Sequence, residues 1–248
     1  MVLQRALTGA ATFFLIFGSM TGPAVGAEDK PAARPWSGSA GLAFLATSGN
    51  TDTQTLGLDL AFKRVPEPWG LDFTANYLRS EDSGITTAER YGAKLRGQRS
   101  LSERWAVFAG LSGERDTFSG YDLRGVVEAG GTYTVLPGPT HTLAFDCGLT
   151  WTKEDLVTGP TNNSLGALAG LSYTWKPREG TQLSEHLVWY PNFDETGNWR
   201  ATSETAFQAA LSERLAVKLS YEVRHYNQPV PGFDKTDTTT KASLVASF

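Results

Sequence analysis

DTTTKASLVASF, residues 237–248, alternates strictly between two kinds of side chain. From Thr238 to Phe248 every second residue is Thr, Ala, Leu or Phe, whereas the residues between them are mostly polar and include Lys241. A two-residue period of this kind places one apolar and one mostly polar face on a β-strand. The chain therefore ends on a two-faced strand whose last residue is aromatic.

The same alternation returns at regular intervals from Trp36 onward, separated by turns rich in Gly, Pro, Asn, Asp and Ser. Each segment is close to the 9–11 or so residues that a tilted strand needs to cross the hydrocarbon of a membrane. The pattern predicts an all-β fold, a transmembrane antiparallel up-and-down β-barrel of about twelve strands. The predicted strands are 36–47, 53–63, 70–80, 88–99, 104–115, 122–134, 141–153, 163–175, 181–191, 198–210, 214–226 and 237–248.

The connections between these strands fall into two alternating classes. One end carries short turns, and the other carries mostly longer, acidic loops. Short turns face the periplasm in outer-membrane barrels, and an even strand count places both termini on that side. The predicted turns are 63–69, 100–104, 136–140, 177–180 and 211–214, and the predicted loops lie around 50–52, 81–87, 116–122, 155–162, 192–197 and 227–237.

Alternate positions separate a lipid-facing set of side chains from a lumen-facing set. In 214–226, Leu215 and Val217 lie on one parity, and Lys218 and Glu222 lie on the other. Charges of both signs fall on the lumen side, so they can pair across the lumen or define a narrow ion path. The residues expected to line the lumen are Asp59, Asp72, Arg90, Lys94, Arg96, Glu114, Arg124, Glu128, Asp146, Glu204, Lys218, Glu222, Arg224 and Lys241.

The tryptophans check this topology independently. They fall near the two ends of the strands, as expected for aromatic girdles at headgroup depth. Segment 181–191 fits least well, because Glu185 shares the parity of the apolar residues. The predicted girdle residues are Trp36, Trp69, Trp105 and Trp175 at the periplasmic boundary, and Trp151, Trp189 and Trp199 at the outer one.

The N-terminus has the features of a secretory signal peptide. Arg5 precedes the apolar run AATFFLIF (10–17), and small residues before Glu28 offer a cleavage site. We expect a signal peptide at 1–27, a short periplasmic tail at 28–35 and an outer-membrane barrel at 36–248. The formal net charge of −4 does not favour nucleic acid as a partner.

Three segments resemble a known family. TSGNTDT (47–53), DTFSGYDLR (116–124) and the terminal strand are similar to the YdiY-like family, largely uncharacterised outer-membrane proteins described as salt-induced. The resemblance implies an outer-membrane barrel of a Gram-negative bacterium with a link to salt or osmotic stress, and it supplies no catalytic or ligand residues. Phe248 resembles the terminal signal read by the barrel assembly machinery. The other expected partners are membrane lipid, lipopolysaccharide and small ions or solutes.

The sequence carries no recognisable catalytic motif. His141, His186 and His225 form no motif with Ser and an acidic residue, which disfavours a hydrolase at the barrel rim. No cofactor or metal is expected, since no spacing reproduces an EF-hand or zinc site. The lone Cys147 is interpreted as a small apolar residue.

We therefore expect a non-catalytic outer-membrane barrel, either a narrow pore or a closed, stress-related envelope protein. The alternatives are a rim hydrolase of lipase or protease type and a soluble exported β-barrel that binds a small ligand.

Overall fold

The computed structural model describes residues 36–47, 53–65 and 68–248. The predicted signal peptide and tail, and the residues 48–52 of the first loop, lie outside the described residues. Within the described ranges no helix is long and apolar enough to cross a membrane. The described residues form twelve strands: β1 (Trp36–Thr47), β2 (Thr53–Arg64), β3 (Trp69–Asp82), β4 (Ile85–Ser100), β5 (Trp105–Asp116), β6 (Tyr121–Pro137), β7 (His141–Leu156), β8 (Thr161–Arg178), β9 (Thr181–Tyr190), β10 (Arg200–Ala210), β11 (Leu215–Tyr226) and β12 (Thr236–Ser247).

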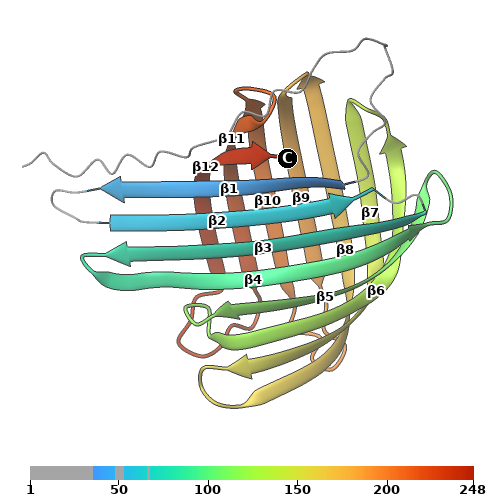
Figure 1. Cartoon of the computed structure of the whole chain (residues 1–248). Helices are drawn as coiled ribbons and strands as arrows, with labels where there is room; N and C mark the ends of the chain where they lie inside the picture. Colours follow the sequence, from blue (N-terminus) through green and yellow to red (C-terminus); the bar gives the residue numbers. More distant parts are fainter. Residues whose placement is uncertain (1–35, 48–52, 66–67) are drawn as a thin grey trace, which may run out of the picture. The chain divides into compact units, whose positions relative to one another are not determined.

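The strands form one closed antiparallel barrel in which each strand pairs with its neighbours in the sequence and β1 pairs with β12. Figure 1 shows β1–β5 crossing the near wall while β8–β12 run at a steep angle behind them. This crossing reflects the tilt that strands need in order to close a sheet. The prediction of an up-and-down barrel of about twelve strands is confirmed.

The seam between β1 and β12 is the shortest ladder of the barrel. It pairs only Ser39–Leu42 with Leu244–Ser247, whereas β1 pairs with β2 along its whole length. Beyond that ladder the backbone N–H and C=O of Gly38 bond to the C=O and N–H of Phe248, at 2.9 and 3.0 Å. A Cβ on residue 38 would lie 2.3 Å from the Phe248 ring, so glycine leaves the room in which the ring packs. The terminal residue therefore extends the closure of the barrel.

The loop-end connections are shorter than the sequence suggested, because several strands run on into the acidic segments. The predicted loop 81–87 is a two-residue turn, Ser83–Gly84, between β3 and β4. Asp116 ends β5, and Glu154 lies within β7. Among the described connections at this end, only 191–199 and 227–235 remain long.

The outer face of the barrel is apolar and the inner face is polar. Large apolar side chains are exposed on all twelve strands, for example Leu58 on β2 and Leu219 on β11. Among the described residues no large side chain is fully buried, so the barrel lacks an ordinary apolar core. An exposed apolar band around a closed barrel is the surface that a membrane-spanning barrel presents to lipid.

Candidate functional site: the barrel lumen

All fourteen charged residues expected in the lumen take part in ion pairs. They lie on the parity opposite to the exposed apolar residues, as the pairing of Asp59 with Asn76 and of Leu58 with Tyr77 illustrates. The pairs are of two kinds: some join strands that are one or two places apart in the barrel wall, and others cross the lumen.

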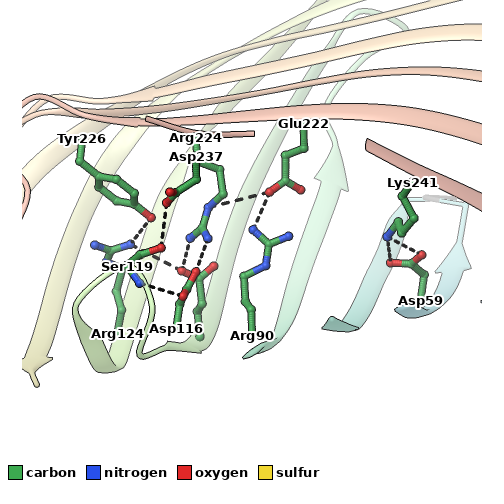
Figure 2. Close-up of polar contacts among 11 residues, drawn as sticks. Asp59, Arg90, Asp116, Ser119, Arg124, Glu222, Arg224, Tyr226, Asp237 and Lys241 are labelled. Atoms are coloured by element: carbon green, nitrogen blue, oxygen red, sulfur yellow. Dashed lines mark hydrogen bonds and ion pairs between the residues drawn. The ribbon is translucent and has the colours of Figure 1, made fainter. Parts of the chain in front are cut away.

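The main crossing joins β11 to β5, which lies half-way round the barrel. Arg224 on β11 contacts Asp116 at 2.6 Å and also binds Glu114, and both carboxylates belong to β5 (Figure 2). The Arg224 side chain is 7% exposed and that of Asp116 is 8% exposed. Because the three side chains extend from opposite walls, they bridge the lumen at this level.

Two further contacts cross the lumen beside Arg224. Arg90 on β4 pairs with Glu222 on β11 at 2.6 Å. Arg124 on β6 donates a hydrogen bond of 3.2 Å to the hydroxyl of Tyr226, at the end of β11 (Figure 2). Together with Arg224, these contacts tie β4, β5 and β6 to β11.

A second network lies on one wall of the lumen. The carboxylate of Glu128 on β6 lies 2.9 Å from Nζ of Lys94 and 2.9 Å from Nε of Arg96, both of which are on β4. Arg96 also contacts Asp146 on β7 at 2.6 Å, and its guanidinium lies 3.7 Å from the ring centre of Phe108. This network spans β4 to β7 and leaves the facing wall to other pairs.

The remaining lumen pairs are local. Lys218 contacts Glu204 at 2.6 Å across the β10–β11 ladder. Lys241 on β12 binds both carboxylate oxygens of Asp59 on β2 at 2.7 Å (Figure 2). The last of the expected residues, Asp72, lies 3.5 Å from Lys63 on the neighbouring strand.

Besides Lys63, the partner of Asp72, three residues of the lumen network were missed by the sequence reasoning. Asp116 lies in the predicted loop around 116–122 and Glu154 lies beyond the predicted strand 141–153, so neither was assigned to the lumen. In the structure Asp116 is a buried strand residue bound to Arg224, and Glu154 is a half-buried strand residue bound to Arg124. Arg200, the first residue of β10, lies 3.6 Å from Glu154. A signal for Arg200 was present, because it shares the even parity of the lumen residue Glu204.

The loop between β11 and β12 covers the lumen at the loop end. Val230 of this loop is 5% exposed and packs with Tyr121 and Tyr226, which are each 4% exposed. A Cβ on Gly120 would lie 2.7 Å from Cβ of Val230, and Gly120 has φ +92°, so glycine both fits this turn and admits the valine. Next to Gly120, Ser119 donates a hydrogen bond of 2.8 Å to Asp237 at the start of β12 (Figure 2).

The turn end of the lumen is more open. A cavity of about 590 Å³ lies among the turn-end segments of β7 to β12. Its walls include the lumen-facing Gln182 and Gln208, and its rim includes Lys176, Glu179 and Arg214 from the turns. The described barrel is therefore asymmetric, with a polar vestibule at the turn end and a closed loop end.

The predicted girdle residues lie at both ends of the strands. Four lie at or near the turn end: Trp36, Trp69 and Trp105 begin β1, β3 and β5, and Trp175 lies near the end of β8. The other three lie toward the loop end: Trp151 and Trp189 on β7 and β9, and Trp199 just before β10. All except Trp199 are large exposed side chains, and Trp199 packs against the His225 ring at 5.0 Å.

The three histidines lie in different environments. His141 bonds to Tyr173 at 2.8 Å and stacks on Trp175 at the turn-end girdle. His225 bonds to Thr236, and His186 bonds to Ser172 at 2.9 Å on the lumen side. Among the described contacts no carboxylate bonds to His186, so the pair lacks the third group of a hydrolase triad.

Glu185 lies on the outer face, as its parity indicated. It is paired in register with Tyr173 and Thr205 and shares the face of Leu183 and Leu187. Ser203 donates a hydrogen bond of 2.6 Å to its carboxylate, and Thr205 donates a second one. The two hydroxyls supply donors that an apolar lipid surface lacks, which lowers the cost of this outward carboxylate.

Comparison with known proteins identifies the family. The model of the family described as "Protein of unknown function, DUF481" matches residues 40–248. The chain belongs to this family. It is 28% identical over 223 residues to "Uncharacterized protein YdiY" of Escherichia coli (strain K12), covering 87% of this chain and 85% of that protein. The resemblance read from the loop motifs is thereby confirmed.

Solved structures of similar fold are outer-membrane barrels. The COG4313 outer membrane channel from Pseudomonas putida F1 has a TM-score of 0.54 at 14% identity, covering 90% of this chain and 100% of that chain. The NanC porin has a TM-score of 0.53 at 10% identity, covering 85% and 98%. The translocator domain of the autotransporter NalP from Neisseria meningitidis has a TM-score of 0.51 at 12% identity, covering 88% and 90%. These proteins share the fold of this chain, that of porin-like outer-membrane β-barrels.

Proposed function

We propose that this protein is a non-catalytic outer-membrane channel for small ions whose loop end is closed in the described conformation. The observation that carries the proposal is the asymmetry of the lumen. The turn end has a polar cavity of about 590 Å³, whereas Arg224, its two β5 carboxylates and the β11–β12 loop bridge or cover the opposite end. A lumen lined by charges of both signs provides sites for ions, and an apolar barrel core would provide none.

The closure depends on contacts that can be broken without unfolding the wall. Val230 belongs to a connection and not to a strand, and it forms a small apolar cluster with Tyr121 and Tyr226. Leu156 and Phe233 pack against this cluster. Moving the 227–235 connection would expose this small cluster but would leave the interstrand ladders intact. The connection is therefore the segment whose displacement would uncover the loop-end mouth.

Planar-bilayer recording of the full barrel tests the proposal. Val230→Asp places a carboxylate in the apolar cluster, so we expect a higher open fraction than in the wild type, which should show brief, small current steps. Val157→Asp is the matched control, because Val157 is 41% exposed in the neighbouring 157–160 connection. Both variants are checked for folding by heat-dependent gel mobility. Absence of steps in the wild type and in Val230→Asp would refute the channel.

A second candidate function is a closed envelope barrel without transport. The full pairing of the fourteen lumen charges favours it, since such pairs can serve structure alone. Silence of both valine variants, with folding intact, is the result that it predicts.

Location, orientation and partners form part of the same proposal. We place the short turns in the periplasm, with lipid and lipopolysaccharide around the apolar band and the barrel assembly machinery acting on the terminal strand. Cysteines introduced at Asn192–Gly197 should label from outside intact cells, whereas one at Glu179 should not, and the reverse pattern would invert the topology. A link to salt or osmotic stress stays a prediction, tested by growth of a deletion strain at high osmolarity.

A further inference from the structure

A small pocket lies beside the loop-end closure, apart from the vestibule. Its volume is about 20 Å³, which accommodates one occupant of the size of a water molecule or a halide ion. Its walls come from β6 to β11 and from the 191–199 connection, and they include Arg124, Arg200, Thr152, Ser164 and Asn198. Apart from Glu154, the charged groups around it are cationic.

Arg124 has one terminal nitrogen that the protein does not satisfy. Its Nε donates to Glu154 at 2.7 Å, and its Nη1 donates to Tyr226 at 3.2 Å and lies 3.6 Å from Glu114. Its Nη2 has no hydrogen-bond partner among the described residues. This nitrogen is buried, and the Arg124 side chain is only 5% exposed. A buried charged donor left without an acceptor is costly, so an acceptor at this position would be stabilising.

The second guanidinium is also short of negative partners. Arg200 lies 3.6 Å from the Glu154 oxygen that Arg124 already uses. Glu114, the other acid near Arg124, is bound by Arg224. Two guanidiniums thus share the carboxylate of Glu154, which is the one acidic side chain among the described residues of the cavity wall.

The aromatic rings direct where an anion can bind. The Arg124 guanidinium lies 3.6 Å from the ring centre of Tyr121, and that of Arg200 lies 4.3 Å from the ring centre of Tyr190. Rings cover the guanidinium faces, whereas N–H donors point outward in the guanidinium plane. The edges that carry the donors therefore remain for an acceptor in the cavity.

We propose that this cavity binds one small anion of halide size, chloride in a physiological medium, held by Arg124 and Arg200. The paired guanidiniums disfavour a cation. The anion site does not depend on the channel proposal, because anion binding and ion conduction are measured in separate experiments.

Thermal unfolding in two sodium salts of equal ionic strength tests the site in solution. Sodium chloride and sodium gluconate screen surface charges equally, but gluconate is too large for the cavity. For the wild-type barrel in detergent, we expect a midpoint about 2–4 °C higher in chloride. Arg200→Gln should abolish this difference, and Lys94→Gln, which removes a lumen cation outside the cavity, should retain it. Equal wild-type midpoints, or a difference that survives Arg200→Gln, would overturn the proposal.

Two further measurements keep the test decisive. If Arg200→Gln does not fold, Thr152→Val removes a hydroxyl from the cavity wall at nearly constant volume and should reduce the chloride effect. Crystals soaked in sodium bromide should show an anomalous peak beside Nη2 of Arg124, and a cavity holding water only would refute anion binding. If the barrel conducts no ions but the bromide peak is present, the channel proposal is refuted and the anion site is supported.

Discussion

Replacing Arg224 by Met should destabilise the barrel strongly, because it leaves two carboxylates without their main cation. Arg224 contacts Asp116 at 2.6 Å and binds Glu114, with an exposed side-chain fraction of 7%. After the substitution Asp116 would keep the backbone N–H of Ser119 at 3.0 Å. Breaking a buried ion pair by removing one partner costs about 3–5 kcal/mol. We expect the free energy of unfolding to fall by that amount.

The assay is equilibrium urea unfolding of the folded barrel in lipid vesicles, followed by tryptophan fluorescence and compared at constant m value. Lys218→Met is the matched control. Its pair with Glu204 is 30% and 36% exposed, so its loss should cost at most about 1 kcal/mol.

A triple variant separates unpaired charge from lost packing. Arg224→Met combined with Glu114→Gln and Asp116→Asn removes the stranded charges, so most of the lost stability should return. The reasoning is refuted if Arg224→Met costs no more than Lys218→Met. It is also refuted if the triple variant is as unstable as the single one.

Deleting Phe248 removes two backbone hydrogen bonds and an aromatic ring next to the shortest ladder. The yield of heat-modifiable barrel in membranes should therefore fall severalfold, whereas Phe248→Tyr should preserve it. Equal yields of the deletion variant and the wild type would contradict a role in barrel closure. Thr205→Val removes one of the hydrogen-bond donors to the outward carboxylate of Glu185, so it should lower the free energy of unfolding by about 1–3 kcal/mol. Thr240→Val, which is also on the outer face, should be close to neutral. Cys147 is exposed on the lipid side of the barrel. In vesicles, an apolar maleimide should label it and a charged, membrane-impermeant maleimide should not, as measured by mass spectrometry. Rapid labelling by the charged reagent would place Cys147 in water.

The strand pattern was predictable because it depends on local geometry. A strand turns successive side chains to opposite faces whatever its neighbours are, so the parity of Leu58 and Asp59 follows from their positions alone. Strand ends were harder, since charged residues such as Glu81 and Asp82 look like loop residues in a sequence. In the barrel they continue β3 beyond the apolar band, where the ladder with β4 still satisfies the backbone.

The sequence by itself determined the barrel, its two faces, the position of Glu185 on the outer face and the set of charges directed inward. Only the tertiary structure decided which of those charges meet. Arg224 and Asp116 are 108 residues apart in the chain and lie on opposite walls. Their contact depends on strand number, tilt and side-chain reach together, and no two-residue period encodes these. The same global geometry decided that the 227–235 connection covers the lumen and that Arg124 and Arg200 share a single carboxylate.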